Sequence, residues 1–268
     1  MSESTTPRPD DNGDDAILKD FSKGVARISF NRPSKRNAIT FSMLQRLRSE
    51  LSLAKLDADV RVVILQGIGD LAFCSGMDLS QASDEDVPMS TVHEVRAAVS
   101  ATCNDLWELG KPTIAKVQGW ALGGGFGLAL ACDLIVASDR SRFGAPEINV
   151  GLWPQVIAVP MIRAMPRRTA LDLMITGRVV DGVEGERIGF VNRLVAHEKL
   201  DDAVNELATA LASKSRVAMR QGRDLFYSLW DASTAEAIAE LQKDIQMDDL
   251  GEGITAFLEK RPPVWTEN

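Results

Sequence analysis

Apolar positions recur along this chain with two different spacings, and the change from one to the other divides it. Short apolar runs bounded by glycines or polar loops, such as Val25–Phe30, 61–66 and Thr113–Val117, are typical of buried strands. Between such runs the apolar residues recur every three or four positions, as they do from 41 to 55, which indicates amphipathic helices. Strands that alternate with helices predict an α/β fold built in layers.

The same patterning predicts the remaining elements. Further strands are expected at 17–18, 134–137 and 191–195, and further helices at 89–109, directly after the glycines near 124, and at 156–164, 168–176 and 183–188. The segment 71–80 is expected to be a loop. From residue 200 onward only helical spacing is found, at 200–214, 215–229, 234–248 and 251–260.

These patterns divide the chain into three parts. Residues 1–15 are rich in Ser, Thr, Pro, Asp and Asn, a composition that cannot offset the entropy cost of ordering, so we expect a disordered acidic tail. Residues 16–198 form the predicted α/β core, and residues 199–268 form a helical region attached to it.

Composition and charge exclude several classes of function. With 268 residues, 45% of them hydrophobic, the chain is long enough for one large core. Its formal charge of −8 disfavours nucleic acid and anionic membranes as partners. Three cysteines and two histidines lack metal-ligand spacing, so no metal site is expected, and the odd cysteine count suits a reducing compartment. Because we find neither a signal-peptide pattern nor a membrane-spanning run, we expect a cytoplasmic protein.

The stretch QGWALGGGFGLALACD, residues 118–133, is the main candidate for a chemical site. Gly123, Gly124 and Gly125 separate an extended apolar segment from the first turn of a buried helix. Glycine permits positive φ and close approach of a ligand, and a helix N-terminus presents unpaired N–H groups that attract negative charge. A dinucleotide-binding loop would need a glycine where Leu128 stands, and no G-K-[ST] follows. An anion or oxyanion site and a tight turn without a ligand are both compatible with these residues alone.

The glycine turn is one of three loops in which a β-rich segment, a glycine and a turn into helix follow one another. The three are FCSGMDL, ALGGGFG and FGAPEINVGLWP. Together with NRPSKRNA before them and EGITAFLEKRPPVW at the C-terminal end, they resemble in sequence and order the crotonase superfamily, the enoyl-CoA hydratase and isomerase family. The resemblance covers almost the whole chain after the tail.

The resemblance implies a fold and a substrate class. The implied fold is a crotonase-type spiral of β-β-α repeats with a helical C-terminal trimerisation region, assembled as a homotrimer or a dimer of trimers. The implied substrate is an acyl-CoA thioester, and coenzyme A then enters as part of the substrate, with no separate cofactor. Two backbone N–H groups clasp the thioester oxygen in such enzymes, and by position they would belong to Ser75 and Gly124.

The resemblance also implies a proton carrier, with one departure. Glu147, in an apolar loop after Pro146, matches the second catalytic glutamate of the hydratases, and burial would raise its pKa toward that of a useful base. The first glutamate, three residues after Gly124, is replaced by Gly127. Eight residues after Glu147, where dienoyl isomerases and aromatic dehalogenases carry an aspartate, this chain has Gln155.

The loss of one acid favours Δ3-Δ2-enoyl-CoA isomerisation by a single glutamate. Two other readings stay open: a 2-enoyl-CoA hydratase that manages with one acid, and a crotonase-fold protein that binds CoA thioesters without turnover. Fold resemblance does not choose among them.

Further residues are expected to contact the substrate. Lys35, Arg36 and Ala38 match the family segment beside the CoA moiety. The two cations suit phosphates, the Lys35 ammonium as a point charge and the Arg36 guanidinium as a planar group with paired donors. Phe257 and Lys260 match residues beside the nucleotide, the lysine reaching the CoA of a neighbouring subunit. The remaining candidates stand in or next to the three loops: Gly76, Met77, Asp78, Leu79, Trp120, Gly123 and Trp153. Cys74 and His93 are interpreted as structural.

Overall fold

The computed structural model describes residues 16–78, 89–230, 232–241 and 249–266. The predicted tail at 1–15, the candidate Leu79 and the end of the helix predicted at 234–248 lie outside these residues. The division of the chain at residues 198 and 199 stays a prediction.

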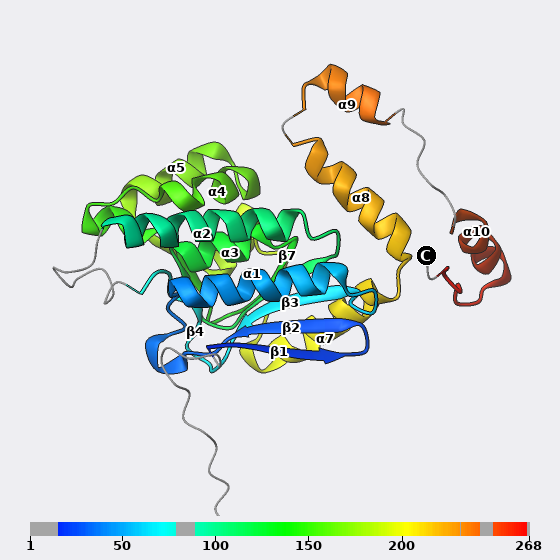
Figure 1. The fold of residues 1–268 in the computed structure, drawn as a ribbon, viewed down its shortest axis with the longest axis horizontal. Helices are drawn as coiled ribbons and strands as arrows, with labels where there is room; N and C mark the ends of the chain where they lie inside the picture. The colour runs from blue at the N-terminus through cyan, green and yellow to red at the C-terminus, as the bar shows by residue number, and fades with distance from the viewer. Residues whose placement is uncertain (1–15, 79–88, 231, 242–248, 267–268) are drawn as a thin grey trace, which may run out of the picture.

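A six-stranded sheet is the framework of the described part of the chain (Figure 1), and its strand order is β1-β2-β3-β5-β7-β10. Its strands are β1 (Ile17–Ser22), β2 (Val25–Phe30), β3 (Val62–Gly67), β5 (Thr113–Val117), β7 (Leu134–Ser138) and β10 (Arg193–Val195). β1 and β2 form an antiparallel hairpin, and the strands from β2 onward pair in parallel. The α/β prediction is confirmed, although β1 is longer than the two residues expected.

A smaller four-stranded sheet, of order β4-β6-β8-β9, was not predicted from the sequence. Its strands are β4 (Ala72–Cys74), β6 (Trp120–Leu122), β8 (Arg142–Gly144) and β9 (Val179–Asp181). The prediction of a loop throughout 71–80 is therefore wrong at β4. Strands of three residues are too short to show a period, and pairing with chain neighbours far away in sequence stabilises them.

Helices cover both faces of the main sheet (Figure 1). The α-helices of the described residues are α1 (Phe41–Leu56), α2 (Met89–Trp107), α3 (Gly124–Ala131), α4 (Ala158–Ala164), α5 (Arg167–Thr176), α6 (Gly182–Ile188), α7 (Leu200–Ala212), α8 (Arg216–Ser228), α9 (Thr234–Leu241) and α10 (Leu250–Glu259). Short 3-10 turns lie at η2 (Pro33–Lys35), η4 (Pro146–Val150), η5 (Gln155–Ile157) and η6 (His197–Lys199).

Both faces of the main sheet are buried, as the alternating residues of β3 show. Val63 and Leu65 belong to the large core shared with α1, α2 and α3, whereas Val62 and Ile64 pack with residues of α7 on the other side. Side chains of a strand alternate between the faces, so a strand with both faces buried reads as an uninterrupted apolar run.

Helices α8 and α9 extend away from the sheet, and α8 is fixed to the core by a polar cluster. Arg223 donates to both carboxylate oxygens of Asp133 at 3.1 and 2.9 Å, and the Tyr227 hydroxyl donates to the same carboxylate at 2.5 Å. In Figure 1, α8 and α9 lie outside the body formed by the sheet and its covering helices. The helical C-terminal region is confirmed, whereas its role in trimer formation stays a prediction. No helix in the described ranges is long and apolar enough to cross a membrane.

Candidate active site

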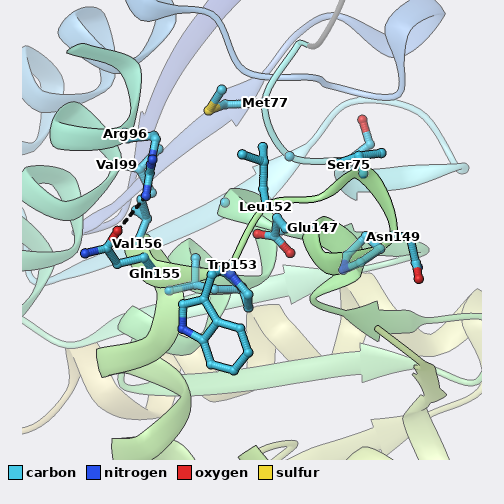
Figure 2. A pocket seen from close by; sticks show the side chains of 17 residues that line it. Ser75, Met77, Arg96, Val99, Glu147, Asn149, Leu152, Trp153, Gln155 and Val156 are labelled. Carbon is cyan, nitrogen blue, oxygen red and sulfur yellow. Dashed lines mark hydrogen bonds between the residues drawn. The ribbon is translucent and has the colours of Figure 1, made fainter. Parts of the chain in front are cut away.

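A cavity of about 260 Å³ lies where the N-terminus of α3 meets the stretch from η4 to η5. Four segments line it: residues 75–77 after β4, two residues of α2, the glycine turn, and the stretch that begins at Pro146 and ends at Ile157. Seven of the predicted site residues line this cavity: Ser75, Gly76, Met77, Gly123, Gly124, Glu147 and Trp153. Figure 2 shows Glu147 in the middle of this lining, with Arg96 and Gln155 to one side.

The glycine turn owes its shape to Gly123 and Gly125. Gly123 has φ of +51°, which an L side chain rarely adopts, and its N–H donates to the Gly144 carbonyl at 2.9 Å. A Cβ at Gly125 would lie 2.3 Å from the Cys74 carbonyl oxygen, so only glycine lets α3 approach β4 this closely. As the first residue of α3, Gly124 has an N–H outside the helical hydrogen-bond ladder, and Gly124 lines the cavity.

The segment after β4 brings a second backbone donor to the cavity. The Ser75 N–H donates to the Arg36 carbonyl at 3.1 Å, and the Gly76 N–H approaches the Cys74 sulfur at 3.4 Å. Within the described part of the chain, the Met77 N–H has no recorded acceptor, although Met77 lines the cavity. This geometry changes the sequence-based assignment, because the Ser75 N–H is occupied and the Met77 N–H is available to pair with that of Gly124.

The two segments that carry these donors are in contact. A Cβ built on Gly76 would lie 3.6 Å from the Gly124 nitrogen, and 2.9 Å from the Leu122 carbonyl oxygen. The positive φ of Gly76, +94°, lets the chain turn at this point. The Met77 and Gly124 N–H groups therefore stand on adjacent strands of backbone, with the positive end of the α3 dipole behind one of them.

Glu147 presents a half-buried carboxylate with one buried oxygen that has no partner among the described residues. Its Oε2 is buried and has no hydrogen bond among the described residues. Its Oε1 lies close to the glycine turn, 3.1 Å from where a Cβ on Gly123 would stand. Burial raises the pKa of Glu147 above its ordinary value, which makes the carboxylate a stronger base.

The space beside Gly127 is filled by Ile157. A Cβ on Gly127 would lie 2.4 Å from Ile157 Cγ2 and 3.0 Å from its Cβ. Both residues are fully buried. The place of the missing acid is thus packed with hydrocarbon, and Glu147 is the one carboxylate among the described residues that line the cavity.

The NRPSKRNA loop is tied to the segment 75–78 by buried polar contacts. Arg32 Nη1 donates to the Ala38 carbonyl at 2.8 Å and to the Asp78 carboxylate at 3.0 Å. The Asn37 side chain donates to the Ala72 carbonyl, and the Ile39 N–H donates to the Gly76 carbonyl, both at 2.8 Å. The candidates Lys35, Arg36, Ala38 and Asp78 are thus placed beside the cavity but do not line it. Lys35 and Arg36 are exposed, Ala38 is buried and Asp78 is half-buried.

The remaining predicted residues lie away from the cavity. Trp120 opens β6, is 37% exposed and does not line the cavity, whereas Trp153 does. Phe257 is exposed near the end of α10, and Lys260 is the C-cap of that helix. Their predicted role concerns a neighbouring subunit, so it stays a prediction.

Ten lining residues of the described chain were not proposed as site residues from the sequence: Arg96, Val99, Pro146, Asn149, Val150, Leu152, Pro154, Gln155, Val156 and Ile157. Arg96 and Val99 lie on α2, far from the three loops in sequence, and no motif marks them. Arg96 Nη2 donates to Gln155 Oε1 at 2.8 Å, so Gln155, which stands eight residues after Glu147, takes part in the wall of the cavity. Among the described residues no group of three His, Cys, Asp or Glu side chains is placed to hold a metal.

The layered fold, the paired backbone donors and the single buried carboxylate define a crotonase-type protein. The family model described as enoyl-CoA hydratase/isomerase matches residues 20–268. The chain belongs to the enoyl-CoA hydratase/isomerase family.

Similar proteins bear names of the same kind. The mitochondrial enoyl-CoA hydratase domain-containing protein 3 of Rattus norvegicus is 34% identical over 251 residues, which cover 91% of this chain and 82% of that protein. A probable enoyl-CoA hydratase of Mycobacterium leprae is 32% identical over 257 residues, covering 94% of this chain and 98% of the relative.

Solved structures of similar proteins share the fold. A crystal structure of an enoyl-CoA hydratase from Mycobacterium smegmatis superposes with a TM-score of 0.87 at 32% identity, covering 93% of this chain and 98% of that one. A Bacillus anthracis enoyl-CoA hydratase gives a TM-score of 0.89 at 28% identity, with 94% and 100% of the two chains covered. The crotonase fold expected from the sequence is confirmed.

Proposed function

We propose that this protein isomerises 3-enoyl-CoA thioesters to 2-enoyl-CoA thioesters with Glu147 as its single proton carrier. The observation that carries the proposal is the half-buried Glu147 carboxylate, whose Oε2 has no hydrogen bond among the described residues, in a cavity that also presents the Met77 and Gly124 N–H groups. Such a site can hold the negative charge of an enolate and move one proton.

The reaction needs no further group. Glu147 takes a proton from C2 of the bound acyl group, and the electron pair of that C–H bond delocalises over C1 to C4 and onto the thioester oxygen. The Met77 and Gly124 N–H groups stabilise that oxyanion, and each such donor contributes about 3–4 kcal/mol in comparable sites. Glu147 then returns the proton to C4, and the double bond moves from C3–C4 to C2–C3. No cofactor besides the CoA of the substrate takes part.

Hydration of a 2-enoyl thioester needs one more acid–base group in the site than isomerisation does. Adding water across the double bond calls for a group that holds the water and removes its proton while another protonates the α-carbon. Ile157 fills the space where a second acid at position 127 would stand. A purely binding role fits the site poorly, since the buried Oε2 of Glu147, which has no partner among the described residues, costs free energy that a binding protein need not retain.

A single-acid hydratase is the second candidate, because several relatives bear the name enoyl-CoA hydratase. In that case Glu147 alone would hold and activate the water. The two candidates differ in the substrate consumed and in the atoms added to the product.

The test mixes the purified protein with a 3-enoyl-CoA and, separately, with a 2-enoyl-CoA, and identifies the products by mass and double-bond absorbance. We expect isomerisation of the first without gain of mass and no hydration of the second. Glu147→Gln is expected to lower turnover about 10²- to 10⁴-fold, the range for loss of a general base. Glu198→Gln, an exposed glutamate outside the cavity, is the matched control and is expected to keep full turnover. Isomerisation that survives Glu147→Gln would disprove the mechanism, and a gain of one water on the 2-enoyl substrate would favour the hydratase.

The same proposal covers the assembly of the protein and the compartment in which it acts. We propose a homotrimer or a dimer of trimers, acting in the cytoplasm on acyl-CoA thioesters. The exposed apolar residues of the C-terminal helices, among them Phe226, Ile254, Phe257 and Leu258, support an assembly that covers them. Size-exclusion chromatography with light scattering tests the number of subunits.

A further inference from the structure

Among the described residues, Arg96 of α2 is the single cationic side chain that lines the cavity. Its neighbours in the lining are mainly apolar or backbone groups, among them Met77, Val99, Leu152 and Trp153. Arg96 is half-buried, so its guanidinium brings a positive charge and several N–H donors to a wall that is otherwise mainly apolar.

The contacts of Arg96 orient its charge without neutralising it. Arg96 Nη2 donates to Gln155 Oε1 at 2.8 Å, and no carboxylate of the described residues lies within ion-pair distance of it. The side chain of Gln155 is neutral, so it fixes the direction of the guanidinium and leaves the positive charge in place. Four further N–H donors of a guanidinium remain for a ligand with acceptor oxygens.

The negative and positive groups of the cavity lie apart. Glu147 comes from η4, whereas Arg96 comes from α2, and Figure 2 shows the two side chains separated, with Arg96 directed toward Gln155. An anionic group on a bound acyl chain would be repelled by an ionised Glu147 and attracted to Arg96. The site therefore favours an acyl chain whose reacting carbons lie at Glu147 and whose far end bears a negative charge.

We propose that Arg96 selects acyl-CoA thioesters whose acyl chain carries a second carboxylate at its distal end. The carboxylate would accept hydrogen bonds from the guanidinium that Gln155 holds in place. The cavity of about 260 Å³ suits a short chain rather than a long one. This inference deepens the proposed isomerisation, since it names the substrate class for the same site, and it rests on the proposed use of that site for acyl thioesters.

Binding of substrate analogues tests the inference without requiring turnover. Glutaryl-CoA and pentanoyl-CoA have the same number of acyl carbons and differ at the distal end, which is a carboxylate in one and a methyl group in the other. Isothermal titration is expected to give a Kd for glutaryl-CoA about tenfold lower than for pentanoyl-CoA, the scale of one charge-assisted hydrogen-bonded pair.

Variants of Arg96 test whether its guanidinium is responsible for the preference for glutaryl-CoA. Arg96→Gln is expected to bring the ratio of the two Kd values near one or to reverse it, and Arg96→Lys is expected to keep part of the preference. Arg140→Gln removes one positive charge from an exposed position outside the cavity and is expected to leave the ratio at its wild-type value. Circular dichroism of each variant establishes that it is folded before the ratios are compared.

Two results would overturn the inference. A wild-type ratio near one would show that the distal group is not recognised, and an equal loss of affinity for both thioesters in Arg96→Gln would place the guanidinium at the CoA moiety. Turnover of the matched unsaturated thioesters separates this inference from the proposed function. If the preference for glutaryl-CoA is found and neither 3-enoyl substrate reacts, the isomerase proposal fails and the specificity of Arg96 stands.

Discussion

Ile157 occupies the space into which a side chain at Gly127 would project. The distance from a Cβ on Gly127 to Ile157 Cγ2 would be 2.4 Å, shorter than real Cβ contacts. Position 127 lacks an acid and also lacks room for one, because Ile157 fills the space that its side chain would need. Glu147 is therefore the one carboxylate among the described residues that line the cavity.

A glutamate at position 127 is expected to destabilise the protein rather than create a hydratase. Gly127→Glu and Gly127→Ala introduce the same Cβ clash, so each should lose about 1–3 kcal/mol of unfolding free energy, as overpacked cores do. Pairing Gly127→Glu with Ile157→Ala removes the 2.4 Å contact and should recover part of that loss. Urea denaturation measures the stability, and product mass measures any hydration. Equal stability of Gly127→Ala and wild type would mean that Ile157 yields easily.

The two glycines that follow Gly123 should respond in opposite ways to alanine. A Cβ on Gly125 would lie 2.3 Å from a backbone oxygen of Cys74, so Gly125→Ala must move α3 or β4 and should cost about 1–3 kcal/mol. A Cβ on Gly124 meets Val99 and Ile39 at 3.6 Å or more, which is ordinary contact, and the φ of Gly124 is not positive. Gly124→Ala should therefore keep or raise stability by up to about 1 kcal/mol. Thermal unfolding of both variants distinguishes them, and a similar loss in both would contradict the close packing described for Gly125 alone.

The sequence predicts those strands, helices and site residues whose pattern lies within one continuous stretch of the chain. β2, β3 and β5 are buried on both faces, so their apolar runs mark them, and the helix α1 shows its period in Leu44, Leu47 and Leu51. Glu147 and Gly124 stand in contiguous motifs, and both were predicted as site residues and line the cavity.

Features that depend on contacts between distant segments could not be predicted. The strand β4 exists because Cys74 and Ala72 pair with β6, and three residues show no period of their own. The available N–H belongs to Met77 because the Ser75 N–H is taken by Arg36, which depends on how residues 32–39 fold back. Arg96 reaches the cavity from another element, and no pattern in the sequence connects it with Gln155.

Asp78 is expected to contribute to stability through Arg32. The side chains of this ion pair, at 3.0 Å, are largely buried, with 4% of Arg32 and 9% of Asp78 exposed. Removing one partner leaves a buried charge without compensation, so Asp78→Ala should lose about 3–5 kcal/mol of unfolding free energy. The double variant Arg32→Leu/Asp78→Ala should lose less than Asp78→Ala, since no buried charge remains. The midpoint of urea denaturation measures both, and a double variant that loses more than the single one would contradict this account.

The raised pKa of Glu147 predicts that the residue lowers stability where it is ionised. Burial raises the pKa of this carboxyl in the folded protein above its value in the unfolded chain, so the folded state binds the proton more tightly. Protonated Glu147 therefore favours folding at low pH, and that contribution is lost as the pH rises through the folded-state pKa. Glu147→Gln has no such titration.

At pH 7 to 8 we expect Glu147→Gln to be more stable than the wild type, by about 1 kcal/mol, the scale of a buried polar atom without a partner. The difference should shrink as the pH falls below the folded-state pKa, because both side chains are then neutral. Unfolding midpoints of both proteins at several pH values measure this, with Glu198→Gln as the control for loss of a surface charge. A difference that is constant across the pH range would show that the stability change does not come from the ionisation of Glu147. In the wild type, kcat/KM for the 3-enoyl substrate should fall as the pH drops through the same pKa, since only the carboxylate can accept the proton at C2.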